Sequence, residues 1–214
     1  MDSLGMKPEE IETESFRIID LEAGDHGWPR AEWQIVRRAI HTSADFEYAQ
    51  SMVLSEDVID YAVAALKSGA GIVTDTNMAL SGISKPRLAD FGCPLSCHVA
   101  DPDVAGQAKA GGITRSIAAM RKAVADPANR IFVIGNAPTA LFELLRLIEK
   151  GAAKPALIIG LPVGFVGAEE SKNALASGNY DIPFITNIGH PGGNLRQTLR
   201  QLQIRTFRLL VFFQ

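Results

Sequence analysis

One histidine stands where it could transfer a proton. His41 is one of four histidines in the chain and follows the basic pair Arg37 and Arg38. It ends a run with apolar residues at helical spacing, and an imidazole ordinarily titrates near neutral pH, so it can donate or accept a proton. A histidine at a helix end can also serve as a cap or a packing residue. Residue type and spacing alone leave both interpretations open.

A second cluster carries the residue types of a metal site. Cys93, Cys97 and His98 lie within six positions of one another. No further pair of ligands follows at a spacing that is usual for zinc, which favours two ordinary buried thiols. Two cysteines also fit a reducing cytosol. We therefore expect no metal site here.

Size, charge and hydropathy narrow the class of protein. A chain of 214 residues that is 47% hydrophobic can bury the core of one domain over residues 1–214. The net charge of −3 argues against a nucleic-acid partner, because such domains usually carry a basic face. No apolar run is long enough to span a membrane, and residues 1–14 are acidic and lack the apolar stretch of a signal peptide. We expect a cytoplasmic protein with neither nucleic-acid nor membrane partners.

Short apolar runs alternate with helical patterns along most of the chain. Strands are expected over 71–75, 94–99, 130–135, 156–160 and 183–187. Helices are expected over 11–23, 29–40, 55–69, 101–112, 114–124, 138–150 and 168–177. Strands that alternate with helices of about 10 to 15 residues predict parallel βαβ units with both sheet faces covered. The sequence therefore predicts one open, doubly wound, Rossmann-like α/β domain with a mostly parallel sheet.

Three loops follow the ends of predicted strands, over 74–78, 135–139 and 161–167. In doubly wound folds, ligands bind outside the carboxyl ends of the strands. Each loop brings glycine, proline or small polar residues to the start of a helix, where backbone N–H groups can hold an anion. Tight-turn geometry explains any one of them, whereas three together favour a ligand site.

The common cofactor motifs are missing. No GxGxxG follows the first strand, and Gly160, Gly164 and Gly167 have the wrong spacing. No GxxxxGK[ST], GxSxG or HExxH occurs either. The motifs thus disfavour a nucleotide-dependent oxidoreductase, and we expect an α/β enzyme without a cofactor that binds its ligand at the strand ends.

Five stretches resemble the precorrin-8X methylmutase family, which also has a cobalt-precorrin-8 form. They are residues 14–19 (ESFRII), 37–41 (RRAIH), 112–116 (GITRS), 134–142 (IGNAPTALF) and 154–172, which includes GLPVGFVGAEESK. The last two are long and specific. The resemblance covers about residues 8–186.

The resemblance implies an isomerase of cobalamin biosynthesis. Family members move a methyl group from ring carbon 11 to ring carbon 12 of the tetrapyrrole precorrin-8X or cobalt-precorrin-8, giving hydrogenobyrinate or cobyrinate. This intramolecular rearrangement needs no redox cofactor. The resemblance implies that His41 is the proton donor or acceptor at ring C, that Ser15 and Arg38 contact the substrate, and that the protein is a homodimer with sites near the subunit interface.

The implied substrate carries many carboxylates, which favours arginines and helix N-termini around it. Arg38 and Arg115 are the expected substrate-binding arginines. Lys85, Arg87 and Lys172 are further candidates. A corrinoid-binding protein that has lost turnover is the alternative function, and the sequence leaves open whether the substrate carries cobalt.

The C-terminal region departs from the family pattern. Gly192 and Gly193 match a glycine pair of the family, but residues 194–214 are rich in Arg, Gln and Leu where an alanine-rich helix is usual. We therefore expect an atypical tail over 187–214, from either a changed reading frame near residue 194 or genuine divergence.

Overall fold

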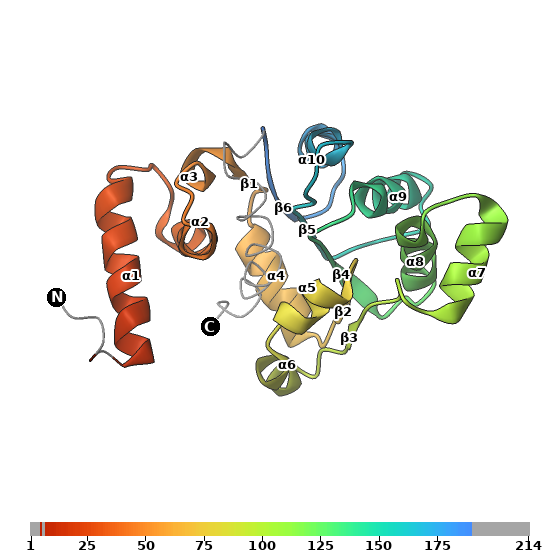
Figure 1. Ribbon diagram of the computed structural model, residues 1–214, viewed down its shortest axis with the longest axis horizontal. Coiled ribbons are helices and arrows are strands. Elements are labelled where there is room, and N and C mark those ends of the chain that lie inside the picture. The colour runs from red at the N-terminus through yellow and green to blue at the C-terminus, as the bar shows by residue number, and fades with distance from the viewer. Residues whose placement is uncertain (1–4, 6, 190–214) are drawn as a thin grey trace.

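A six-stranded sheet forms the centre of the molecule in the computed structural model, which describes residues 5 and 7–189 (Figure 1). Its strands are β1 (Met52–Leu54), β2 (Gly71–Thr74), β3 (Leu95–Ser96), β4 (Asn129–Ile134), β5 (Leu157–Gly160) and β6 (Phe184–Asn187). Their order across the sheet is β1-β6-β5-β4-β2-β3. β1 runs antiparallel to β6, and the other neighbours pair in parallel. The predicted mostly parallel α/β sheet is confirmed.

Helices connect the strands. They are α1 (Pro8–Ala23), α2 (Arg30–Ser43), α3 (Tyr48–Ser51), α4 (Val58–Lys67), α5 (Asn77–Gly82), α6 (Lys85–Phe91), α7 (Pro102–Gly111), α8 (Arg115–Val124), α9 (Pro138–Glu149) and α10 (Ala168–Ser177). Thr114 caps α8, because its hydroxyl accepts the Ile117 N–H at 3.2 Å. Along the described ranges no helix is both long and apolar enough to cross a membrane.

The apolar strands have two buried faces because each face is covered by helices. In β4, Ile131 and Val133 belong to one core, whereas Phe132 and Ile134 belong to the other. The first core also receives apolar residues of α2 and α4, and the second receives those of α8, α9 and α10 (Figure 1). This period of two explains why continuous apolar runs form central strands.

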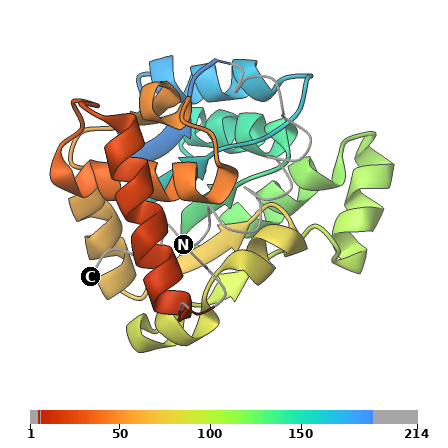
Figure 2. The ribbon, with the colours of Figure 1, turned by 60° about the vertical axis from the view of Figure 1, so that its left-hand side comes forward.

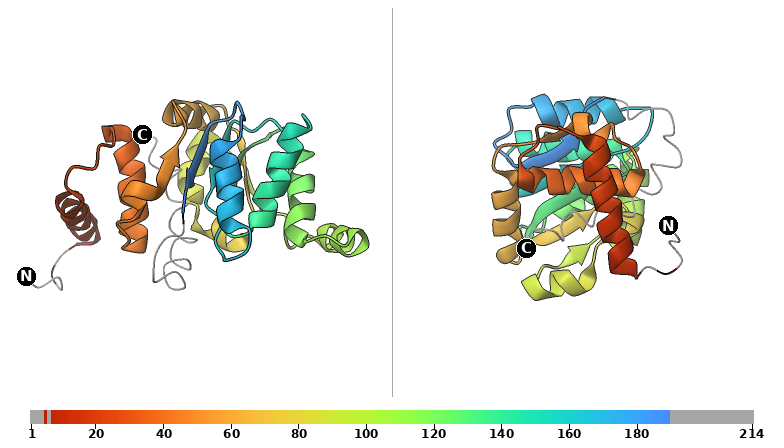
Figure 3. Two further views of the ribbon diagram at one scale, coloured as in Figure 1. Left: turned by 90° about the horizontal axis from the view of Figure 1, so that it is seen from above. Right: turned by 90° about the vertical axis from the view of Figure 1, so that its left-hand side faces the viewer.

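Helix α1 lies outside the two layers that cover the sheet. It packs on α2, which separates it from the strands (Figure 3, left), and it crosses the front of the molecule in Figure 2. Asp20 of α1 accepts hydrogen bonds from Trp33 Nε1 at 2.8 Å and from Arg37 at 2.7 Å. Gly24 ends the helix at a φ of 58°, a conformation that glycine adopts readily.

Several short elements differ from the sequence prediction. The strand expected over 94–99 is reduced to Leu95–Ser96, at the edge of the sheet. The pattern gave no sign of β1, α3, α5 or α6, since elements of three to seven residues do not complete a detectable period. The tail expected to be atypical lies outside the described residues from position 190 onward.

Candidate active site

His41 lies in the last turn of α2, beside Phe16 of α1. The two ring centroids are 5.1 Å apart and the planes are tilted by 44°. The guanidinium carbons of Arg37 and Arg38 each lie 4.4 Å from the centroid of the same Phe16 ring, a distance typical of cation–π contacts. His41 is half-buried at this contact. Phe16 thus contacts one imidazole and two guanidinium groups where α1 packs on α2.

Arg38 also contacts α1 through an ion pair. Only 3% of its surface is exposed, and it forms a salt bridge with Glu12. Since Arg38 and His41 are three positions apart on α2, they lie on the same face of that helix. The arginine and the histidine named by the sequence therefore occupy one side of the α1–α2 contact.

Ser15 lies one turn after Glu12 on α1. Its hydroxyl donates a hydrogen bond to the Ile11 carbonyl oxygen at 2.7 Å, within its own helix. Positions 12 and 15 share a helix face. Ser15, Arg38 and His41 are therefore brought to the same pair of helices. The resemblance at residues 14–19 gave Phe16 no role of its own. An aromatic residue next to Ser15 and a double arginine on the neighbouring helix are nevertheless the two parts of a cation–π cluster.

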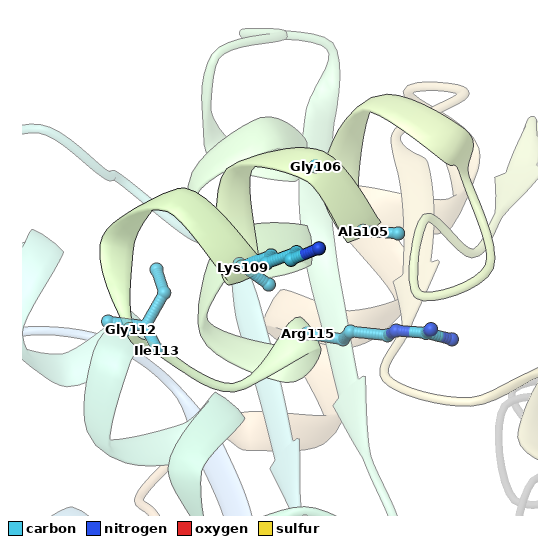
Figure 4. Close-up of a pocket in the computed structure, with 7 residues that line it drawn as sticks. Ala105, Gly106, Lys109, Gly112, Ile113 and Arg115 are labelled. Atoms are coloured by element: carbon cyan, nitrogen blue, oxygen red, sulfur yellow. The ribbon is translucent and has the colours of Figure 1, made fainter.

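Arg115 lies elsewhere. It is the exposed first residue of α8 and lines a hollow of about 560 Å³ between α7 and α8. Figure 4 shows the side chains of Lys109 and Arg115 extending in the same direction from this hollow. Helix α1 lies at one end of the molecule's longest axis and α7 at the other (Figure 1). Within one chain, Arg115 is therefore not brought together with His41.

The other basic candidates are also scattered. Lys85 and Arg87 are exposed on α6. Lys172 is buried on α10, where its ammonium donates a hydrogen bond to Asn187 at the carboxyl end of β6.

The loop after β4 does bind an anion, but that anion belongs to the chain itself. The buried carboxylate of Asp75, which follows β2, accepts hydrogen bonds from the backbone N–H groups of Gly135 at 3.1 Å, Asn136 at 2.9 Å and Ala137 at 2.7 Å. Burial raises the pKa of Asp75, and the three donors oppose this by favouring the ionised form. The expectation that these N–H groups are available to an external ligand is therefore wrong for this loop.

The loop after β5, residues 161–167, presents two exposed apolar side chains at the carboxyl ends of the strands, Phe165 and Val166, which form an apolar lip. Phe165 is 71% exposed and Val166 is 90% exposed. Gly164 adopts a φ of 134°, a conformation that side chains rarely allow, so the tip of the loop requires glycine. Exposed apolar groups beside strand ends suit contact with an apolar surface of a ligand or of another chain.

The cysteines are separate features. The Cys93 thiol is buried and donates to the Leu66 carbonyl oxygen at 3.3 Å, whereas Cys97 is half-buried after β3. Burial raises the pKa of both thiols. Across the described ranges no three histidine, cysteine or acidic side chains lie close enough to hold a metal ion.

Comparison with known proteins identifies relatives in a single family. The sequence profile of the precorrin-8X methylmutase family matches residues 10–195. The chain is 47% identical to the cobalt-precorrin-8 methylmutase of Priestia megaterium, over 89% of this chain and 84% of the relative. It is 42% identical to a precorrin-8X methylmutase of Sinorhizobium sp, over 84% and 85%. The crystal structure of the precorrin-8X methylmutase from Thermus thermophilus superposes with a TM-score of 0.82 at 38% identity, covering 95% of this chain and 94% of that one.

Proposed function

This chain belongs to the precorrin-8X methylmutase family and is an isomerase of cobalamin biosynthesis, and we propose that it moves a methyl group from ring carbon 11 to ring carbon 12 of precorrin-8X or cobalt-precorrin-8. The observation that carries the proposal is the cluster of His41, Arg38 and Phe16 on α1 and α2. It joins a proton-transfer group to an anion-binding group on one helix face.

In this proposal His41 exchanges a proton with ring C while the methyl group migrates. A change in ring protonation redistributes the electrons of the tetrapyrrole and so lowers the barrier to migration. Substrate and product are isomers, so the proton that His41 takes or gives returns within the same turnover. An imidazole suits this task because its two protonation states are close in free energy near neutral pH.

Arg38 and Ser15 position the substrate in the proposed reaction. An arginine has five N–H donors in a planar fork that can bind a carboxylate through charge-assisted hydrogen bonds, which suits Arg38 to a substrate carboxylate. The Ser15 hydroxyl can also accept a further hydrogen bond while it donates to the Ile11 carbonyl oxygen. The apolar lip at Phe165 and Val166 supplies surface for the macrocycle.

We also propose that the enzyme is a cytoplasmic homodimer. The separation of Arg115 from His41 supports an assembly in which a second copy brings its own α7–α8 hollow, with Arg115, toward the α1–α2 pair. Exposed apolar residues of α1, with Leu21 at 72%, supply surface for such a contact. Light scattering should give twice the chain mass of 23.0 kDa, and a species of 23.0 kDa alone at micromolar concentration would contradict the dimer. Cell fractionation tests the location.

Pure protein incubated with metal-free precorrin-8X and, separately, with its cobalt form tests the function. Visible spectra should change as product forms, and the preferred form identifies the native substrate. A spectral shift on binding without product would instead identify a corrinoid-binding protein. The absence of both binding and product would contradict the proposal.

A further inference from the structure

A buried ammonium lies at the carboxyl edge of the sheet. Lys172 is only 4% exposed, and its Nζ donates to Asn187 Oδ1 at 3.2 Å and to the Gly189 carbonyl oxygen at 3.5 Å. No carboxylate in the described part of the chain forms a salt bridge with it. Burial lowers the pKa of Lys172, and the more distant attraction of Glu169 opposes this. A buried cation held only by neutral oxygens is strongly unfavourable unless an anion joins it.

The partner of this ammonium also has an unused donor. Asn187 is 3% exposed, and since an ammonium can only donate, the carboxamide turns its oxygen to Lys172 and its nitrogen away. That nitrogen, Nδ2, is buried and has no hydrogen-bond partner among residues 7–189. Buried polar groups without partners are rare in folded proteins. Within residues 7–189, two donors, one of them charged, thus lack an anionic acceptor at the same place.

The position of the pair matches a ligand site. β6 lies beside β5, so Asn187 ends its strand at the edge that also carries the 161–167 loop. Asn187 is followed directly by the exposed residues Ile188 and Gly189, so the buried pair lies close to the molecular surface. In sheets of this kind, ligands bind outside the carboxyl ends of the strands.

We propose that Lys172 and Asn187 form a receptor for one carboxylate of the tetrapyrrole substrate. The ammonium supplies the countercharge and one hydrogen bond, and Asn187 Nδ2–H supplies a second. The inference rests on the proposed function, because the substrate is a polycarboxylate. Such charge-assisted bonds also orient a ligand, so the pair positions the macrocycle and takes no part in proton transfer.

A purely structural role would be different. Lys172 would then join α10 to the end of β6, and any acceptor at position 187 would preserve that link. The variant Asn187→Asp separates the two roles. It keeps the lysine and its contact but places a carboxylate of the chain beside the ammonium, where the substrate carboxylate would otherwise bind.

Equilibrium binding of hydrogenobyrinate, followed by visible absorbance, tests the inference on the full chain. Lys172→Met should weaken binding by roughly 10- to 100-fold, the range expected for loss of a charge-assisted bond. Asn187→Asp should weaken it by a similar factor without lowering the melting temperature. Lys154→Met is the matched control, because Lys154 is exposed at a hollow beside the start of β4, and its Kd should be unchanged.

The outcomes separate this inference from the proposed function. If the wild type binds hydrogenobyrinate and Asn187→Asp binds it equally well, the receptor is wrong and the function stands. If Asn187→Asp lowers the melting temperature, Lys172 does not lack a countercharge, and the inference fails as well. If Lys172→Met does not fold, Asn187→Asp alone decides. A wild-type protein that neither binds the corrinoid nor turns over precorrin-8X overturns both.

Discussion

The α1–α2 pair and the ends of β2 and β4 both hold a buried charge, but in different ways. Arg38 contacts one carboxylate on a neighbouring helix and the face of an aromatic ring. Asp75 accepts three consecutive backbone N–H groups. Side-chain partners can rotate and be exchanged, whereas backbone donors are fixed by the strand and helix that carry them. The helix pair is therefore suited to exchanging partners with a substrate, and the strand ends to keeping a fixed shape.

This contrast gives a rule that can be tested. Substitutions in the α1–α2 pair should change turnover or binding more than stability. Substitutions at the ends of β2 and β4 should change stability first.

The largest effect is expected for His41→Ala. Turnover should fall by roughly two to four orders of magnitude, the range for a positioned acid–base group, while binding of hydrogenobyrinate persists. The matched control is His26→Ala. His26 stacks on Trp33 with ring centroids 3.6 Å apart, and its Nδ1 accepts the Trp28 N–H. That variant should lose melting temperature and keep turnover, and a fully active, stable His41→Ala would contradict the catalytic role.

Arg38→Ala should weaken substrate binding by roughly 10-fold or more, with KM changing before kcat, because it removes a charge-assisted contact. Arg37→Ala is the comparison, since Arg37 lies at the same 4.4 Å from the Phe16 ring but pairs with Asp20. Equal changes in KM for the two variants would mean that stacking on Phe16, and not contact with substrate, explains the result.

Asp75→Asn should lower the free energy of unfolding by about 1 to 3 kcal/mol, because an amide group cannot accept all three backbone donors. Urea denaturation measures the change. Asp126→Asn is the control, since Asp126 is exposed and accepts a single N–H, from Ala128. Should Asp75→Asn unfold like the wild type, the strand ends do not depend on this carboxylate.

The smallest effect concerns Glu143 on α9. Its hydrogen bonds to Arg146 and Arg121 hold its pKa below the usual range, so the stabilisation is present above the unfolded-state pKa and is lost as pH falls through the lower folded-state pKa. Glu143→Gln should lose about 1 kcal/mol or less at pH 7, because both arginines are partly exposed. The difference from wild type should vanish in acid. A difference that persists at low pH would mean that packing, and not charge, is involved.

The sequence predicted the long elements well and the site in part. The helix expected over 168–177 has those bounds, since its first turn is acidic and glycines flank it at positions 167 and 178. β1 was missed because three residues carry no period and because its partner is more than a hundred residues away. Ser15, Arg38 and His41 were identified through the family resemblance, and the structure brings them to one pair of helices.

Other parts of the site depend on tertiary contacts that spacing cannot encode. Glycine and small polar residues in the loop after β4 correctly indicated an anion, but the sequence could not reveal that Asp75, sixty positions earlier, supplies it. Lys172 was counted among ordinary basic candidates, because its burial beside Asn187 exists only after α10 packs on the sheet.

The antiparallel edge has a consequence for how the chain folds during synthesis. β1 pairs with β6, so Met52 lies opposite Asn187. Among the strands of the described residues, translation supplies β1 first, yet its hydrogen-bonding partner β6 leaves the ribosome after the other five. Until β6 emerges, the edge of β1 that will pair with it remains unpaired. An unpaired strand edge favours association with other chains. A ribosome stalled before residue 184 should therefore display β1 in a protease-sensitive form, and release of β6 should protect it.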